Sequence, residues 1–216
     1  MKVLIADNNR SVITAVEQYD PTFDFRVGNP LAYDIDAVVS PANTKGIMNG
    51  GFDAVLRRFF GTIIEVRARQ YLEKHPLDVG QAAAIKTSHK TVRWLIISPT
   101  VSIKGNGFSG NDTVAYACGY NSVIAANRAG ATNLGMTGLG TGAGALDIRH
   151  AIKQQCDGIE DALYDISHGA LNYVLTTRTT TDPLATLLKT PIYQRYWGSV
   201  CWRMGPLLTK EIPPLA

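Results

Sequence analysis

Residues 36–53, DAVVSPANTKGIMNGGFD, decide the fold. The apolar run 37–39 near the start has the length and composition of a buried strand in a parallel sheet. A polar turn follows, and the glycine pair Gly50-Gly51 then precedes an amphipathic pattern that predicts a helix. The first N–H groups of a helix lack partners within the helix and can hold an anion. The stretch therefore predicts a binding site for a phosphate-bearing ligand.

Two polar side chains of this stretch, Asn43 and Asp53, are placed to reach the group that carries the anion. Each also has a purely structural interpretation. Asn often bonds its own backbone in a turn, and an Asp in the first turn of a helix stabilises it through the helix dipole. The residues alone leave both interpretations open.

The composition is that of an ordinary soluble globular protein, since 45% of the 216 residues are hydrophobic and 18% are charged. The net charge of +3 is mild and is not gathered into runs. It suits an anionic small molecule, whereas nucleic-acid binding normally requires a clustered basic face. The composition therefore gives no clear nucleic-acid footprint.

The three cysteines, Cys118, Cys156 and Cys201, lie far apart and have no histidines close to them in sequence. We therefore expect neither a disulfide framework nor a metal site, and interpret the first two as core residues. No stretch approaches the roughly 18 consecutive apolar residues of a membrane span. The N-terminal apolar run is too short for a signal peptide. A cytoplasmic location is the expectation.

Strands and helices are predicted to alternate along the chain. Besides the strand at 37–39, strands are expected at 2–6, 23–27, 80–87, 93–98 and 132–137. One helix is expected at 11–19, with Ser11 as N-cap, and a second from residue 52. A third is expected after a cap at Asn111 or Asp112, and a fourth from about residue 147. This alternation predicts an α/β layered fold in which helices cover a mixed sheet.

The helix that starts at residue 52 is predicted to be long, because apolar residues recur at spacings of three and four. The expected buried stripe is Phe52, Val55, Leu56, Phe59, Ile63 and Val66. The intervening charged residues, interpreted as a solvated face, are Arg57, Arg58, Glu65, Arg67 and Arg69.

A second glycine-rich turn, GLGTGAG at 138–144, follows the predicted strand 132–137, and a further glycine-rich loop lies at 105–110. In layered α/β folds, ligands bind beyond the carboxyl ends of the strands. The turns around Gly50 and at 138–144 both follow strands, so they are expected at one edge of the sheet. Two such turns imply a ligand with more than one phosphate.

Residues 1–170 are predicted to form one domain, and 171–216 a C-terminal extension of different composition. Prolines interrupt the extension repeatedly, but it also holds Tyr193, Tyr196, Trp197 and Trp202. Disordered segments are usually poor in aromatic residues. We therefore interpret the extension as a segment that packs on the domain or on a protein partner.

These motifs resemble the macro domain, the ADP-ribose-binding fold. The family signature has a Gly-Asp-Ile turn, then Asp-Ala-Ile-Val-Asn-Ala-Ala-Asn, then a Gly-Gly-Gly-Val turn that opens a helix. The matching segments here are GNP at 28–30, DAVVSPAN at 36–43 and NGGFD at 49–53. The family's second phosphate loop, Gly-x-Gly-Thr-Gly, resembles 138–144, and the resemblance covers roughly residues 25–165. It implies a three-layer α/β/α sandwich around a mixed, mostly parallel central sheet.

The resemblance also implies an ADP-ribose cleft. Both glycine turns would present N–H groups to the diphosphate, and Asn43 would hydrogen-bond the distal ribose. Asp53 matches the acidic residue found beside that ribose in the ADP-ribosyl-hydrolase branch, which makes Asn43 and Asp53 the candidate catalytic residues. The implied ligand-binding residues are Gly28, Asn29, Ala42, Asn43, Asn49, Gly50, Gly51, Phe52, Gly138, Leu139, Gly140, Thr141, Gly142, Ala143 and Gly144.

Several positions depart from the family pattern. Asn29 stands where the family usually has the Asp that reads adenine; its side-chain oxygen can still accept from an exocyclic amine but carries no charge. Asn49 replaces a glycine, and Ser40-Pro41 replaces Asn-Ala. Ala143 replaces an aromatic residue near the ribose, which predicts a more open distal pocket.

The function implied is hydrolysis of mono-ADP-ribose from modified macromolecules, or of a related ADP-ribose derivative, with no cofactor besides ADP-ribose as ligand or product. Two alternatives stay open: a non-catalytic ADP-ribose reader, and a structural protein that docks a partner through 171–216. A dinucleotide oxidoreductase is disfavoured, because Asp7-Asn8-Asn9-Arg10 stands where that fold needs a glycine-rich turn.

Overall fold

The computed structural model describes residues 1–103 and 113–169. Three of the predictions lie outside these residues: the glycine-rich loop 105–110, a helix cap at Asn111 or Asp112, and the packing of the extension 171–216.

A mixed six-stranded sheet forms the centre of this part, with strand order β2-β1-β6-β3-β5-β4. Five strands run parallel, and β4 pairs antiparallel with β5 at one edge. The strands are β1 (Lys2–Asp7), β2 (Asp24–Val27), β3 (Ala37–Ser40), β4 (Ala83–Lys86), β5 (Trp94–Ile97) and β6 (Asn133–Met136). The predicted mixed, mostly parallel sheet is confirmed.

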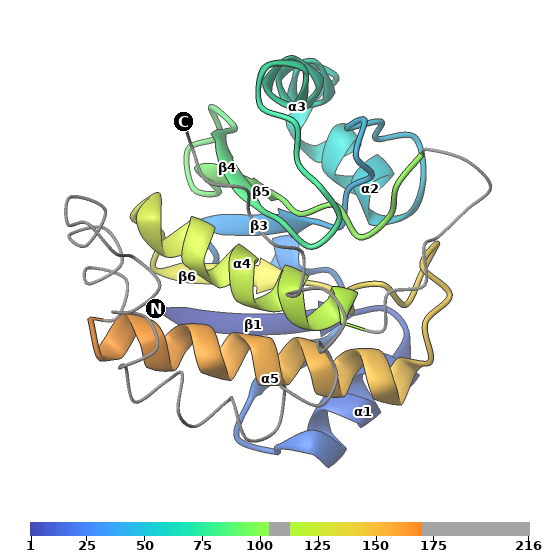
Figure 1. Ribbon diagram of the computed structural model, residues 1–216, viewed down its shortest axis with the longest axis vertical. Helices are drawn as coiled ribbons and strands as arrows, with labels where there is room; N and C mark the ends of the chain where they lie inside the picture. Colours follow the sequence, from blue (N-terminus) through green and yellow to red (C-terminus); the bar gives the residue numbers. More distant parts are fainter. Residues whose placement is uncertain (104–112, 170–216) are drawn as a thin grey trace, which may run out of the picture. The chain divides into compact units, whose positions relative to one another are not determined.

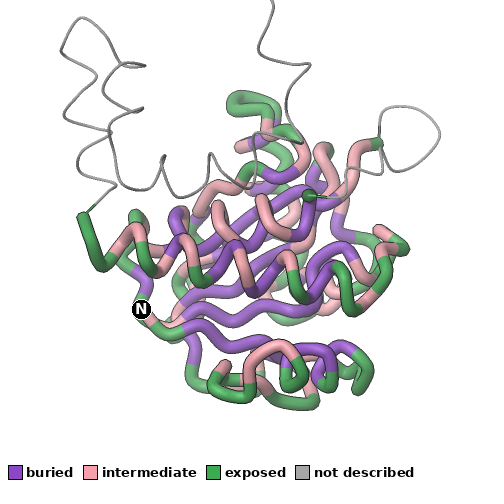
Figure 2. Tube along the Cα trace, turned by 60° about the horizontal axis from the view of Figure 1, so that its bottom comes forward, coloured by how far each residue is buried: buried purple, intermediate pink, exposed green. Residues whose placement is uncertain are grey.

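Helices cover both faces of the sheet, so the three-layer prediction is confirmed as well (Figure 1). One layer holds α2 (Gly51–Phe60) and α3 (Ile63–Lys74), together with the short 3-10 helix η1 (Pro30–Ala32). The other layer holds α1 (Arg10–Tyr19), α4 (Val114–Arg128) and α5 (Ile148–Ser167). Buried chain runs through the strands between these layers (Figure 2).

The central strand β3 is buried at every position, as its apolar sequence predicted. Val38 belongs to a core cluster with Leu56 of α2 and Ile64 of α3. Its neighbour Val39 is also fully buried and, because side chains alternate along a strand, faces the layer of α4 and α5. Burial on both faces holds β3 rigidly, and its carboxyl end therefore positions the polar turn that follows.

The long helix predicted from residue 52 is in fact two helices. Gly61 stands between α2 and α3 with φ +81°, a conformation that favours glycine. Beyond the break, Ile63 and Val66 of α3 are 49% and 46% exposed, and Phe59, in the last turn of α2, is 41% exposed. The residues that α3 buries instead are Ile64, Ala68 and Leu72. The predicted stripe holds at Leu56, which is fully buried, and is wrong at Phe59, Ile63 and Val66. It fails at Ile63 and Val66 because it assumed one continuous helical phase across Gly61.

The other helices agree closely with the sequence predictions. Asp147 caps α5 through a hydrogen bond from His150 N–H. Helix α1 is capped by Asn9, not by Ser11, because Asn9 Oδ1 accepts from Ser11 N–H at 3.0 Å. Cys118 and Cys156 are buried free thiols. Within residues 1–103 and 113–169, no helix has the length and apolar character to cross a membrane.

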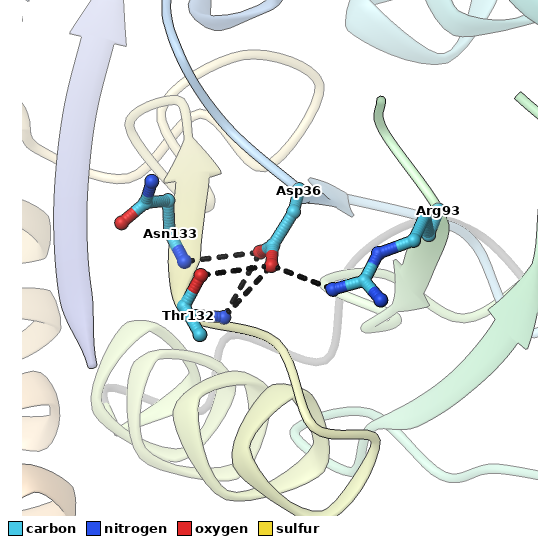
Figure 3. A network of polar contacts seen from close by, with 4 residues as sticks. All are labelled: Asp36, Arg93, Thr132 and Asn133. Atoms are coloured by element: carbon cyan, nitrogen blue, oxygen red, sulfur yellow. Dashed lines mark hydrogen bonds and ion pairs between the residues drawn. The ribbon is translucent and has the colours of Figure 1, made fainter. Parts of the chain in front are cut away.

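Asp36 joins three strands at the amino edge of the sheet (Figure 3). Its carboxylate accepts hydrogen bonds from the backbone N–H groups of Thr132 and Asn133, at 3.0 Å each, and pairs with Arg93 at 3.0 Å. Burial alone would raise the pKa of Asp36, but these hydrogen bonds outweigh it and lower the pKa. The first residue of the opening stretch therefore stabilises the fold, on the edge opposite the glycine turns.

Candidate functional site

A cavity of about 550 Å³ opens at the carboxyl ends of the parallel strands. Both glycine-rich turns line it, so their predicted placement at one edge of the sheet is observed. Of the candidate site residues, it brings together Gly28, Asn29, Asn43, Asn49, Gly50, Gly51, Phe52, Asp53, Gly138, Gly140, Thr141, Gly142, Ala143 and Gly144. A volume of this size is typical of a small-molecule site.

Ala42 and Leu139 do not line the cavity. Ala42 is 2% exposed and packs in the core on the α2–α3 side of the sheet. Leu139 is fully buried, and its N–H donates to Gln155 Oε1 at 2.8 Å. Both side chains are therefore absent from the cavity surface, and the assignment of these two residues to ligand binding stays a prediction.

Asp53 is the most perturbed carboxyl group of the cavity. It lies in the first turn of α2, is 5% exposed, and accepts a 2.6 Å hydrogen bond from Ser40 Oγ. Burial raises its pKa to about 6; the Ser40 hydrogen bond opposes this rise and the negative charge of Glu65 adds to it. A carboxyl group with such a pKa in a cavity wall is a candidate general base.

The first glycine turn leaves open space above its backbone. A Cβ added at Gly50 would meet nothing within 4 Å, and the same holds for Gly142 of the second turn. Gly51, the first residue of α2, has φ +54°, which lies in the left-handed region. Gly50 and Gly51 thus line the cavity at the start of α2 without a side chain, as a close approach of an anion to the backbone requires.

In the second glycine turn, fewer N–H groups than predicted can receive an anion, because two of them are already engaged within the protein. Gly138 N–H donates to Asp7 Oδ2 at 3.1 Å, and Leu139 N–H is engaged by Gln155. The N–H groups left to receive a ligand are those of 140–144. Gly144 is required by the bend itself, because a Cβ there would lie 2.1 Å from the backbone oxygen of Gly140.

The matching family model is that of the macro domain, and it spans residues 39–155, more than half of the chain. This chain belongs to the macro domain family. The model covers both glycine turns and Asp53.

Two relatives of this macro domain are uncharacterized proteins. The one from Aeropyrum pernix is 30% identical over 119 residues, which are 55% of this chain and 60% of the relative. The one from Aquifex aeolicus is 35% identical over 74 residues, 34% of this chain and 43% of the relative. The matched segment therefore spans less than two thirds of either relative.

Solved structures show the same fold. The macrodomain of Mycobacterium tuberculosis DarG has a TM-score of 0.53 at 16% identity, covering 62% of this chain and 87% of that one. A Trypanosoma brucei macrodomain in complex with ADP-ribose has a TM-score of 0.52 at 18% identity, covering 64% and 56%. At these identities the likeness establishes the fold alone.

The amide of Asn43 is largely used within its own loop. Its Oδ1 accepts from the N–H groups of Lys45 and Ile47, both at 3.1 Å, and its Nδ2 donates to the Ile47 oxygen at 2.8 Å. Both interpretations of Asn43 thus apply at once: it shapes the turn, and one Nδ2 hydrogen remains to reach a ligand.

Asn29 is also committed in part. Its Oδ1 caps η1 by accepting from Leu31 N–H at 2.9 Å. The oxygen that was expected to accept from an exocyclic amine retains one lone pair for a ligand in this macro domain.

Several residues at the site were not predicted from the sequence. Asp7 ends β1, Asn8 and Asn9 follow it, and all three line the cavity. Their signal was available, because polar residues after a parallel strand lie at the ligand-binding edge. Gln155 had no such signal: it is fully buried in α5, donates to the Thr137 oxygen at 3.0 Å, and so fixes the second glycine turn.

A metal centre is not indicated by the described part of the chain, which contains no group of three or more His, Cys, Asp or Glu residues placed to hold an ion.

Proposed function

We propose that the cavity binds ADP-ribose, with the diphosphate held by backbone N–H groups of the two glycine turns. Membership of the macro domain family supports this, as do the open spaces above Gly50 and Gly142. The Trypanosoma brucei relative that shares the fold was solved with ADP-ribose, and the Oceanobacillus iheyensis macrodomain, 17% identical at a TM-score of 0.51, with ADP.

We further propose that the protein hydrolyses mono-ADP-ribose linkages, with Asp53 as general base. A pKa of about 6 keeps most of the Asp53 population ionised at neutral pH, yet leaves the carboxylate basic enough to accept a proton. Water attacks the anomeric carbon of the distal ribose while its proton passes to Asp53. The bond from that carbon to the acceptor breaks, and its electron pair leaves with the acceptor.

The other residues of the site support this reaction by positioning. The remaining Nδ2 hydrogen of Asn43 can donate to a hydroxyl of the distal ribose. N–H groups of both turns fix the diphosphate, which keeps the anomeric carbon within reach of the water held by Asp53. The observation that carries the proposal is the buried Asp53 carboxylate between the two glycine turns.

The test is release of ADP-ribose from a mono-ADP-ribosylated protein by wild type and by Asp53→Asn. Loss of a general base is expected to slow release at least roughly 100-fold, whereas calorimetry should show that ADP-ribose binding is kept. Asp34→Asn, at an exposed carboxylate outside the cavity, is the matched control. Unchanged release by the Asp53 variant would contradict the role given to Asp53.

A reader of ADP-ribose without catalysis is the second candidate function. It is favoured by Asn43, three of whose four hydrogen-bonding positions are satisfied within its own loop. Micromolar binding of ADP-ribose, with no release from ester-linked or N-linked substrates, would establish the reader in place of the hydrolase.

A further inference from the structure

Glu65 is a largely buried carboxylate just outside the cavity, although its place in the sequence suggested a solvated face. Its side chain is 16% exposed. Oε1 accepts from the backbone N–H of Met48 at 3.2 Å, and Oε2 lies 2.8 Å from Arg57 Nε. Met48 directly precedes Asn49-Gly50-Gly51, the first glycine turn. One side chain of α3 therefore touches both the turn and a cation of α2.

Arg57 is a cation on the same helix as Asp53. The two residues are four apart on α2, and side chains at that spacing meet on the helix surface. Instead, Arg57 pairs with Glu65 of the next helix. Its Nε is shielded from solvent, but the side chain as a whole is 42% exposed and so has room to reorient. In the absence of Glu65, the nearest carboxylate along α2 is that of Asp53.

We propose that Glu65 is a positioning residue of the cleft, which holds Arg57 away from Asp53 and fixes the backbone of Met48 ahead of the first glycine turn. This deepens the proposed function, because it concerns the same site and the same base. Glu65 touches no ligand in this account. It acts through Arg57 and through the turn.

The charges around Asp53 explain why the position of Arg57 matters. Arg57 lies four residues away on the same helix, the charge of Glu65 on α3 raises the pKa of Asp53, and Asp7 lines the same cavity at the end of β1. A cation in contact with a carboxylate favours its ionised form and weakens it as a base. With Arg57 bound by Glu65, the Asp53 carboxylate is contacted by the Ser40 hydroxyl.

The first experiment is a double-mutant cycle read out by the titration of Asp53 in the ligand-free protein. The ¹³C carboxyl resonance of Asp53, assigned with Asp53→Asn, is followed against pH in wild type, Glu65→Gln, Arg57→Gln and the double variant. Gln retains an acceptor for the Met48 N–H and nearly the same shape as Glu. The cycle therefore measures the effect of the Glu65 charge and of its pairing with Arg57, while the packing of the side chain stays nearly the same.

The titration midpoint is expected to fall by about one to two pH units in Glu65→Gln, because the released Arg57 moves toward Asp53. In the Arg57→Gln background, the same Glu65 substitution should lower the midpoint much less. Equal shifts in the two backgrounds would overturn the proposal, since Glu65 would then act only as a nearby charge. An unchanged midpoint in Glu65→Gln would overturn it as well.

The second experiment addresses the turn. Glu65→Ala removes the acceptor of the Met48 N–H and is expected to weaken ADP-ribose binding roughly ten-fold, whereas Glu65→Gln should bind nearly as wild type does. Equal affinity of the Ala variant and wild type would contradict the fixing of the turn. If wild type itself fails to bind ADP-ribose, the proposed function is wrong, and the titration of the ligand-free protein still decides the role of Glu65.

Discussion

Ser40 Oγ donates a 2.6 Å hydrogen bond to Oδ1 of Asp53, and both side chains are buried. Ser40 ends the central strand β3, and Asp53 lies in the first turn of α2. The bond therefore ties together the two halves of the stretch that sets the fold. Because a hydrogen bond to the ionised carboxylate favours that form, Ser40 limits how far burial raises the pKa of Asp53.

Ser40→Ala should raise the pKa of Asp53 above its value of about 6. A hydrogen bond to a charged group contributes about 1.5–3 kcal/mol, which corresponds to roughly one to two pH units. The pH profile of ADP-ribose release should move upward by that amount, with lower activity at pH 6. Ser122→Ala, at another fully buried serine, is the matched control and should leave the profile in place. A profile that does not move would show that Asp53 does not control the pH dependence.

Asp53→Asn should stabilise the fold at neutral pH. The folded protein raises the pKa of this carboxyl group from 3.8 to about 6, so it binds the proton more tightly than the unfolded chain does. The contribution of this carboxyl group to stability is therefore most favourable at low pH. It declines as pH rises from about 4 to about 6 and is then constant. A rise of about two pH units corresponds to about 3 kcal/mol, and Asn avoids much of that cost. Urea denaturation should show the variant about 1–3 kcal/mol more stable at pH 7 and equal to wild type near pH 4.

Gly50→Ala and Gly142→Ala should weaken ADP-ribose binding while leaving the fold intact. Neither position has a positive φ, and an added Cβ meets nothing in the protein, so the methyl group intrudes only on a bound ligand. We expect each to cost about 1–3 kcal/mol of binding free energy, measured by calorimetry, with the melting temperature within a few degrees of wild type. Gly130→Ala, at a helix end with φ +76°, is the converse control: it should lower stability and leave affinity unchanged.

Asp36→Asn should destabilise the protein without affecting ligand affinity. The substitution removes the charge that holds Arg93 and weakens the bonds to Thr132 and Asn133, at an expected cost of about 2–4 kcal/mol. Because folding lowers the pKa of Asp36, its contribution is full at neutral pH and is lost as pH falls below about 4. Urea denaturation at pH 7 and pH 3 measures both effects. A variant as stable as wild type at pH 7 would contradict the role of Asp36 at the amino edge.

Much of the architecture follows from local patterns. The apolar run 37–39 predicted a buried parallel strand, and its flanking turns predicted the cavity edge, because strand direction and glycine conformations are properties of short segments. The break between α2 and α3 was missed, since the apolar spacing around Gly61 fits a continuous helix and only the backbone shows the change of phase.

The site was harder to predict where contacts are distant in sequence. Gln155 and Glu65 act on turns that lie 16 and 17 residues away, and no local pattern distinguishes them from other polar helix residues. Asp7 bonds to Gly138 across 131 residues. The side chains of Ala42 and Leu139 are buried although their sequence neighbours line the cavity, and no local pattern predicted that difference.

Calorimetric titration of the protein with ADP-ribose, with AMP and NAD as comparison ligands, tests the central claim most directly. The account predicts micromolar binding of ADP-ribose, about −8 kcal/mol, and weaker binding of the other two. Gly142→Ala should lower the affinity for ADP-ribose, whereas Asp53→Asn should leave it unchanged. Absence of heat with ADP-ribose at millimolar concentration would contradict the account, because the two glycine turns would then line a cavity that does not bind this diphosphate.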